Sequence, residues 1–336
     1  MKPLLLVLLL GTAGCALSMP GGRLAAASPT PSPAPGPTAA PATPEAPLGT
    51  QQNPLVVALP PSRTQPQGDV LNAGQVLTSL LEKNTGYDFA SVLPPTEGEL
   101  IRGIGNGDTD IAALSPFGYL LASESGEARA AFAREQSGKI FYGAELIAPA
   151  SGYRSYWDPV QQANAAAAPA ALAQLAGKKP CWTDAHSPSG YVVPLGTLKQ
   201  AGVATREAAF LASHTAVVRA LYAGGICDFG ATYVGAIDYP GLEDELPDVN
   251  KRILVIWRIP AIIPYETLAF SSRIPIEMRR MLTRTLVDLM DTDEGRSAMQ
   301  VLYGFDAMQI VDDGQYEEFR SIVEASGLKL EGLIDP

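Results

Sequence analysis

Residues 184–194, with the sequence D-A-H-S-P-S-G-Y-V-V-P, place two hydroxyls and a glycine between a strand-like run at 179–183 and an apolar segment. Three kinds of site use such a pattern: a serine nucleophile, the cap of an ordinary helix, and a cradle of hydrogen-bond donors for an anion. Each of them places different demands on the neighbouring residues, so the neighbours discriminate between them.

The spacing around the serines does not fit a nucleophile elbow. That turn requires G-x-S-x-G, because two glycines relieve the crowding at a sharp strand-to-helix corner. Around Ser189 the order is S-P-S-G-Y, so Ser187 and Tyr191 stand where glycines are needed, and no S-x-x-K pattern follows either serine. His214 could act as a general base, so a serine hydrolase stays among the alternatives.

The same residues fit both a helix cap and an anion cradle. Serine is favoured at the start of a helix because its oxygen accepts an unpaired N–H group of the first turn. Ser187, Ser189 and Gly190 together offer more than a cap needs: two hydroxyls, a backbone N–H that a ligand can approach closely, and the positive end of a helix. The local sequence leaves both interpretations open.

Two further loops have the same character. S-H-T at 213–215 and S-P-F-G-Y at 115–119 each stand between a strand-like and a helix-like segment. Loops at the carboxyl ends of strands are where open α/β sheets bind ligands. His214, Ser115 and Tyr119 are therefore candidate ligand contacts, although a capped histidine and aromatic side chains of the core would give the same pattern.

Composition limits the partners. Of the 336 residues 46% are hydrophobic and 18% are charged, an ordinary balance for a protein with one or two cores. A formal net charge of -11 argues against nucleic acid and against an acidic membrane surface as partners. The two histidines lack the Cys, Asp or Glu spacing of a metal site, so we expect neither a metal nor a cofactor.

The first 53 residues have the pattern of an export signal followed by a tether. Residues 1–18 combine a basic start, an apolar run too short to span a bilayer, and small residues before Cys15. This resembles a bacterial lipoprotein signal, in which Cys15 is acylated; the alternative is a plain secretory peptide. Residues 19–53 are rich in proline and alanine and cannot bury a core, so we predict a disordered linker between a lipid anchor and the folded body.

From residue 54 onward, strand-like and helix-like segments alternate, which is typical of an α/β fold with mainly parallel sheets. Two long strand-like runs, at 140–148 and 252–264, flank a self-contained α/β pattern. They predict two lobes with two crossings of the chain, residues 54–145 and 262–336 forming the first lobe and 146–261 the second. We expect the helical tail to pack on the first lobe and the alanine-rich residues 163–176 to form a helix.

Cys181 and Cys227 are a candidate disulfide. Exported proteins occupy compartments where disulfides persist. The two cysteines also fall near the starts of strands that would be neighbours in the second lobe. Two buried free thiols are the alternative.

Several segments, taken in order, resemble a known family. They are D-I-A-A-L-S-P-F-G-Y-L-L-A at 110–122, S-P-S-G-Y-V-V-P at 187–194 and S-H-T-A-V-V-R-A-L-Y-A-G-G-I-C-D-F-G-A-T at 213–232, with I-P-I-E-M-R-R-M-L and D-D-G-Q-Y in the tail. In this order and spacing they resemble the phosphate, phosphite and phosphonate substrate-binding proteins of ABC importers over roughly residues 55–328.

The resemblance implies a two-lobed type II periplasmic-binding-protein fold, which closes on a ligand in the cleft between its lobes by hinge motion at the two crossings. It implies that two serines and an amide hold the oxyanion, that a histidine donates to it, and that a tyrosine contacts the ligand from the first lobe. These residues are Ser187, Ser189, Gly190, His214 and Tyr119. Asp228 aligns with a family aspartate that we expect to be structural.

Pro188 departs from the family, which usually has threonine or serine between the two serines. Proline removes one hydroxyl and one N–H donor from the cradle. A monoanionic or differently substituted oxyanion therefore becomes a candidate beside a dianionic phosphonate.

The expected protein is an extracytoplasmic solute-binding lipoprotein without enzymatic activity. It would capture phosphate, phosphite or a phosphonate and deliver it to the permease of an ABC importer, with the lipid anchor as its only link to the membrane. The alternatives are a sulfonate or other organic anion as ligand, a sensory lipoprotein, and the serine hydrolase.

Overall fold

The computed structural model describes residues 46–61 and 66–334. The predicted signal peptide, Cys15 and most of the predicted linker lie outside the described residues, so these assignments stay predictions. Within the described residues, no helix is both long enough and apolar enough to cross a membrane.

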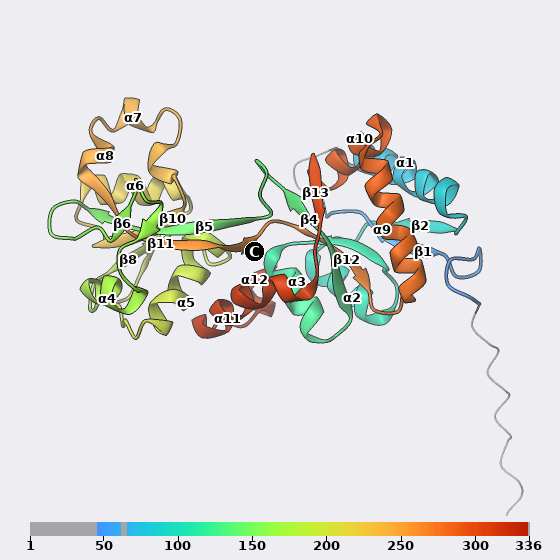
Figure 1. The fold of residues 1–336 in the computed structure, drawn as a ribbon, viewed down its shortest axis with the longest axis horizontal. Coiled ribbons are helices and arrows are strands. Elements are labelled where there is room, and N and C mark those ends of the chain that lie inside the picture. Colours follow the sequence, from blue (N-terminus) through green and yellow to red (C-terminus); the bar gives the residue numbers. More distant parts are fainter. Residues whose placement is uncertain (1–45, 62–65, 335–336) are drawn as a thin grey trace, which may run out of the picture. The chain divides into compact units, whose positions relative to one another are not determined.

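Strands and helices alternate along this part of the chain (Figure 1). The strands are β1 (Leu55–Ala58), β2 (Phe89–Val92), β3 (Ile111–Leu114), β4 (Ala128–Glu135), β5 (Phe141–Pro149), β6 (Trp157–Asp158), β7 (Ala163–Asn164), β8 (Pro180–Trp182), β9 (Ala209–Phe210), β10 (Phe229–Tyr233), β11 (Ile253–Pro264), β12 (Thr267–Ser271) and β13 (Ala307–Ile310). The α-helices are α1 (Gln67–Thr85), α2 (Glu97–Asn106), α3 (Pro116–Glu124), α4 (Ala168–Leu172), α5 (Val193–Gln200), α6 (His214–Ala223), α7 (Leu242–Glu245), α8 (Val249–Arg252), α9 (Ile276–Met290), α10 (Asp293–Tyr303), α11 (Glu317–Ser326) and α12 (Glu331–Ile334). Short helical turns of other types cover 173–175, 188–192, 236–238 and 313–316.

The first lobe is built on a six-stranded sheet in the order β13-β4-β12-β3-β1-β2. Buried side chains of α2 and α3 form one hydrophobic cluster with this sheet, and those of α1, α9 and α10 form another. The helices therefore cover both faces, which is how an α/β sheet removes its apolar side chains from water.

The second lobe is built on a five-stranded sheet in the order β11-β5-β10-β8-β9. Side chains of α6, α7 and α8 cluster on one face, and those of α4 and α5 on the other. β8 lies between β9 and β10 and is parallel to both, so the loops that follow these strands leave the sheet at the same edge.

Both sheets are mixed, whereas the alternating pattern predicted mainly parallel ones. β5 and β11 are antiparallel to each other, and β4, β12 and β13 are also held by antiparallel ladders. The parallel rule applies to strands joined through a crossover helix within one sheet. β12 follows β11 directly after the chain returns from the other lobe, so it has no such constraint.

The two predicted crossings are β5 and β11, whose ladder runs from Ile253↔Pro149 to Pro264↔Phe141. The long apolar runs in the sequence are therefore the strands that connect the lobes.

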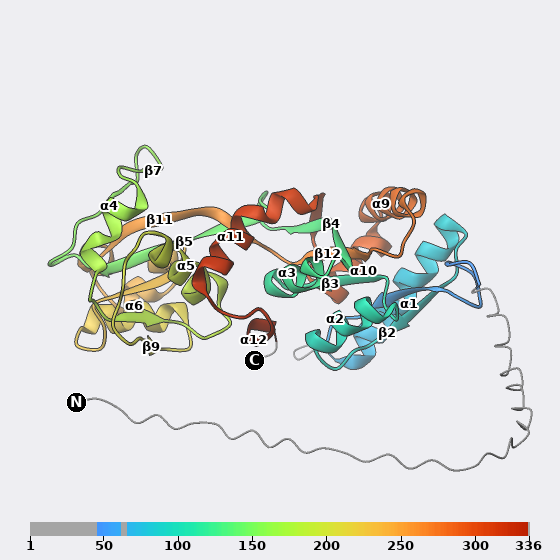
Figure 2. The ribbon, with the colours of Figure 1, turned by 90° about the horizontal axis from the view of Figure 1, so that it is seen from below.

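The carboxyl-terminal part of the chain does not pack on the first lobe alone. α11 packs against α5 of the second lobe, as both views show (Figures 1 and 2). At Gly196 of α5, an added Cβ would lie 2.1 Å from the backbone oxygen of Ile322 in α11, so only glycine allows this approach. The Lys199 ammonium also donates to the Ser326 carbonyl at 2.5 Å. The predicted assignment of the whole tail to the first lobe therefore needs correction, because α11 contacts both.

Residues 46–53 were predicted as the end of the linker, but they belong to the fold. The Gly49 N–H donates to the Asn53 carbonyl at 2.8 Å, and the Asp88 N–H donates to the Gly49 carbonyl at 3.0 Å. Leu48 packs against the first lobe's hydrophobic cluster, which gives this proline-flanked segment enough apolar contact to be ordered.

The alanine-rich stretch 163–176 is only partly helical. Ala163–Asn164 instead forms a two-stranded hairpin with Trp157–Asp158. The Asn164 side chain donates to the Arg258 carbonyl at 2.7 Å and accepts from the Arg258 N–H at 2.9 Å, so contacts with β11 replace the helical pattern there.

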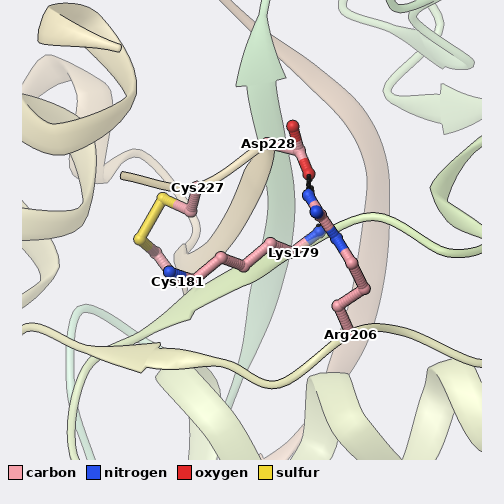
Figure 3. Close-up of a disulfide and its surroundings, with 5 residues drawn as sticks. All are labelled: Lys179, Cys181, Arg206, Cys227 and Asp228. Carbon is pink, nitrogen blue, oxygen red and sulfur yellow. Dashed lines mark hydrogen bonds and ion pairs between the residues drawn. A yellow bond between two sulfur atoms is a disulfide. The ribbon is translucent and has the colours of Figure 1, made fainter. Parts of the chain in front are cut away.

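Cys181 and Cys227 form a disulfide, with 5.7 Å between their Cα atoms (Figure 3). Next to it, the Asp228 carboxylate accepts from the Lys179 N–H at 2.7 Å and from the Arg206 guanidinium at 2.6 Å. The backbone hydrogen bond from Lys179, together with the Arg206 charge, lowers the pKa of Asp228. Asp228 thus fastens the start of β10 to the segment before β8, which is the structural role expected for it.

Candidate functional site

The predicted ligand residues of the second lobe gather at one edge of its sheet. Ser187, Ser189 and Gly190 follow β8, and His214 is adjacent to Tyr233, the last residue of the neighbouring parallel strand β10. Residues more than twenty positions apart are thereby brought together at the carboxyl ends of two strands, where open α/β sheets bind ligands.

Ser187 caps the helical segment that follows it. Its hydroxyl oxygen accepts the Gly190 N–H at 3.0 Å, and its side chain is largely buried. Residues Pro188–Val192 form a π-helical turn that continues into α5, where the sequence had predicted one regular helix. The cap interpretation is therefore correct for the local geometry. An anion that takes the Gly190 N–H has to displace the Ser187 oxygen.

Gly190 is required by close packing. An added Cβ would lie 2.0 Å from Oγ1 of Thr183 and 2.8 Å from Oγ of Ser187. Thr183 thus contacts the predicted ligand residue Gly190, although it was not itself predicted. No motif marks Thr183, because it is a threonine at the end of an ordinary buried strand.

Ser189 contacts a residue from outside its own loop. Its side chain is 3% exposed, and its hydroxyl lies close enough to the hydroxyl of Tyr142 in β5 to lower the pKa of Tyr142 in part. Tyr142 in turn stacks on Tyr265, with ring centroids 5.0 Å apart. Burial is the main cause of a raised pKa of Tyr142, so this hydroxyl stays protonated at physiological pH. Tyr142 is a second neighbour of the predicted ligand residues that was not predicted from the sequence.

His214 is held in one tautomer by a backbone contact. Its Nδ1 accepts the Tyr233 N–H at 3.3 Å, and its ring lies edge-on to the Tyr233 ring with centroids 4.7 Å apart. Burial lowers the pKa of His214, which the Asp184 carboxylate only partly opposes. The ring is therefore neutral at neutral pH with its proton on Nε2, so Nε2 is the nitrogen that can donate to a ligand.

The loop before His214 is fastened to the strand that precedes the serines. The N–H groups of Leu211 and Ala212 both donate to the Thr183 carbonyl, at 3.1 and 2.8 Å. Ala212 has φ = 63°, a left-handed conformation that costs energy for a residue with a Cβ. Ser213 then caps α6 by accepting the Ala216 N–H at 3.1 Å. The two predicted loops are thus joined through Thr183.

A buried ion pair lies on the connecting strands beside this edge. The Glu145 carboxylate in β5 is 1% exposed and accepts from the Arg258 guanidinium and from the Gly235 N–H, at 2.8 and 2.9 Å. Burial raises the pKa of Glu145 despite the Arg258 charge. The Arg258 guanidinium also stacks on Trp157 at 4.0 Å, so the pair fixes β5, β11 and the hairpin to one another.

The first-lobe candidates lie in structural contacts. Ser115 caps α3, its hydroxyl oxygen accepting the Gly118 N–H at 3.1 Å. Tyr119 is fully buried beside Tyr316, and its hydroxyl donates to the Asp313 carboxylate, which also accepts the Ala130 N–H at 2.9 Å. In this geometry the Tyr119 hydroxyl is not presented to a ligand, because an internal carboxylate already accepts its proton.

One other hollow has the charge to attract an anion. A groove of about 630 Å³ lies between α9 and the strands β4 and β13, and four arginines line it together with apolar side chains. They are Arg129, Arg279, Arg280 and Arg284. We call it the arginine groove. None of the predicted ligand residues lines it, although Arg279, Arg280 and Asp312 come from the two tail segments that carry the family resemblance, so it is a competing location for anion binding.

Comparison with known proteins agrees with this architecture. The family described as "ABC transporter, phosphonate, periplasmic substrate-binding protein" matches residues 62–316. The chain is 27% identical over 176 residues to the phosphate-import protein PhnD of Mycolicibacterium smegmatis, an alignment that covers 48% of this chain and 50% of that protein. The matched region therefore spans about half the length of this curated relative.

Solved structures share the fold. XAC2383 from Xanthomonas citri bound to ATP has a TM-score of 0.55 at 13% identity, covering 84% of this chain and 99% of that one. The same protein bound to chloride ion gives 0.54 at 14% identity, covering 83% and 99%. At such identities the likeness concerns the fold alone. The predicted two-lobed type II periplasmic-binding-protein fold is confirmed. The chain belongs to the family of periplasmic substrate-binding proteins of phosphonate ABC transporters, which are transport components and not enzymes.

Proposed function

We propose that this protein captures a small phosphorus oxyanion outside the cytoplasm and delivers it to the permease of an ABC importer. Phosphate, phosphite and small phosphonates are the candidate ligands. The observation that carries the proposal is the convergence of Ser187, Ser189, Gly190 and His214 at the carboxyl ends of β8 and β10.

The donors at this edge suit an oxyanion. Hydroxyl, amide and imidazole N–H groups can all point at a negative oxygen, and such hydrogen bonds are stronger than those between neutral groups. The starts of α6 and of the turn after Ser187 add the positive ends of two helical segments. Neutral His214 donates through Nε2 without adding a positive charge. It therefore gives no preference for a dianionic over a monoanionic ligand.

The first lobe makes a smaller contribution in this proposal. Ser115 and Tyr119 would contact the ligand only if it displaced their present partners, the Gly118 N–H and the Asp313 carboxylate. We therefore assign the principal donors to the second lobe.

Calorimetric titration with phosphate, phosphite and methylphosphonate tests the site. Ser189→Ala and His214→Ala each remove one donor to a charged ligand, which is worth roughly 1.5–3 kcal/mol, so each should weaken binding about 10-fold to 100-fold. Ser297→Ala, on the exposed surface of α10, is the matched control and should bind as the unmodified protein does.

Binding of the anion in the arginine groove would contradict the proposed site. Arg284→Ala changes a residue that lines the groove, well separated in sequence from the serine loop. If Arg284→Ala abolished binding while Ser189→Ala and His214→Ala left it unchanged, the oxyanion site would have to be moved to the first lobe.

The anchor and the transport role need cellular tests. Fatty-acid labelling of the exported protein should be lost in Cys15→Ala, with release of the protein from the membrane fraction. Deletion of the gene should abolish uptake of the radiolabelled ligand found by calorimetry. Normal uptake in the deletion strain would favour a sensory role over import.

A further inference from the structure

We propose that Thr183 is an additional donor to the bound oxyanion and replaces the hydrogen bond that Pro188 cannot make. This inference rests on the proposed function and specifies how its site is completed.

The Thr183 hydroxyl is buried without a partner. Its side chain is 1% exposed, and Oγ1 has no hydrogen-bond partner among the described residues. Buried hydroxyls in folded proteins are nearly always paired, so an unpaired one calls for a specific explanation. A ligand oxygen that arrives from solution can provide the missing acceptor.

The hydroxyl faces the predicted cradle. A Cβ added to Gly190 would lie 2.0 Å from the Oγ1 of Thr183 and 2.8 Å from the Oγ of Ser187. Both hydroxyl oxygens therefore lie on the same side of Gly190. Thr183 Oγ1 is therefore beside the groups that the family resemblance assigns to the oxyanion. It approaches them from the strand, whereas Ser187 approaches from the loop.

The backbone of Thr183 is fixed from both sides. Its N–H donates to the Gly190 carbonyl at 3.3 Å, and its carbonyl accepts from Leu211 and Ala212 in the loop that leads to His214. With both backbone groups engaged, the side-chain hydroxyl is the only polar group of this residue left for a ligand. Its position between the two donor loops is set before any ligand arrives, which reduces the entropy cost of binding.

A second unpaired hydroxyl occurs on the neighbouring strand. Thr232 Oγ1 is fully buried, without a partner among the described residues, and precedes Tyr233, whose N–H holds His214. Among the described residues three buried side-chain atoms lack a hydrogen-bond partner, and two of them lie in or directly after the strands that lead into this site. This clustering favours a ligand-related role for Thr183 over a random packing defect.

Pro188 explains why such a donor is useful here. Proline has no N–H and no hydroxyl, so the loop contributes fewer donors than the serine or threonine usual at this position. A hydroxyl from the end of β8 restores one of them from a different element.

The test is calorimetric titration of the full-length protein with inorganic phosphate, phosphite and methylphosphonate. Thr183→Val keeps the branched shape and removes the hydroxyl, so affinity for the best of these ligands should fall at least 10-fold. The unfolding temperature of the ligand-free protein should not decrease, because no hydrogen bond is lost. Thr183→Ser, which keeps the hydroxyl, should retain affinity within about threefold. Thr197→Val is the matched control, since that buried hydroxyl donates to the Val193 carbonyl within α5.

A double variant distinguishes a donor role of Thr183 from a role in packing alone, because only a lost donor can be replaced from another position. Adding Pro188→Ser to Thr183→Val restores a donor in the loop and should recover at least half of the lost free energy of binding. If Thr183→Val binds as tightly as the unmodified protein while Ser189→Ala and His214→Ala bind weakly, the inference about Thr183 is overturned and the proposed function stands. If the unmodified protein binds none of the three anions, the proposed function itself fails.

Discussion

The hydroxyl of Ser189 lies beside that of Tyr142, which places the predicted cradle next to the first strand that links the lobes. Tyr142 stacks on Tyr265, the residue that follows the second linking strand, β11. A ligand that accepts the Ser189 proton would turn this hydroxyl away from Tyr142. Ligand binding and the contact at the hinge strands therefore compete for one hydroxyl.

This competition predicts opposite effects of Tyr142→Phe on stability and on binding. Loss of the contact between the two hydroxyls should lower the free energy of unfolding by about 1 kcal/mol. Oxyanion affinity should rise about twofold to tenfold, because Ser189 no longer has to leave a partner. Urea unfolding and calorimetry measure the two quantities, with the exposed Tyr239→Phe as control. A fall in affinity would mean instead that the Tyr142 hydroxyl contacts the ligand itself.

The lowered pKa of His214 predicts a pH-dependent loss of stability. Above pH 6.5, the ordinary value, the ring is neutral in both the folded and the unfolded protein and contributes no pH dependence. As the pH falls through 6.5 toward the lower folded pKa, the unfolded state binds the proton first, so the free energy of unfolding decreases. Protonation of Nδ1 would also break the hydrogen bond from Tyr233.

Urea unfolding between pH 7.5 and 5 measures this effect. His214→Gln should remove part of the pH dependence, whereas His186→Gln should retain it and leaves a single histidine signal for NMR titration. A folded-state pKa of His214 at or above 6.5 in that titration would contradict the prediction.

The disulfide should contribute substantially to stability. A loop closed over a sequence separation of 46 residues restricts the unfolded chain, and the chain-entropy estimate for that length is about 4 kcal/mol. Cys181→Ala combined with Cys227→Ala should lower the free energy of guanidinium unfolding by about 2–4 kcal/mol. Intact-mass measurement of alkylated protein, with and without reductant, provides the independent check. Two alkylated thiols in the unreduced protein would show that the bond is absent.

Gly196→Ala should disturb the contact between α5 and α11. The new methyl would overlap the Ile322 carbonyl, and a backbone atom cannot move away by changing rotamer. We expect a loss of about 1–3 kcal/mol in the free energy of unfolding. Gly68→Ala in the first turn of α1 is the control, because its Cβ would meet nothing within 4 Å. Equal stability of the two variants would show that α11 yields without cost.

Much of the fold follows from local pattern. The runs at 140–148 and 252–264 correctly predicted the linking strands β5 and β11, because each is long and rich in apolar residues, interrupted only by Glu145 in the first and by Arg252 and Arg258 in the second. β4, with the sequence A-R-A-A-F-A-R-E, was not predicted, since alanine and charged residues have little preference for strands. Its pairing with β12 and β13, far along the chain, holds it in place.

In the candidate site too, residues with a local sequence motif were predicted, and residues that depend on contacts with other segments were not. Ser187, Ser189, Gly190 and His214 were selected because their loops carry motifs. Tyr142 and Thr183 carry none, and their importance arises from contacts across 47 residues to Ser189 and across seven to Gly190. Tyr119 was selected for its place after a strand, but helix α3 turns its side chain into the core toward Asp313.

The ordered segment at residues 46–53 determines where the folded body would feel a mechanical load from its amino-terminal side. Asn53 donates to the Ala46 carbonyl at 2.8 Å, and Gly49 accepts from Asp88 next to β2. A pulling force on residue 46 would therefore be borne by the outer edge of the first lobe's sheet. The donor loops follow β8 and β10 in the other sheet, so no strand that carries them takes part in this contact.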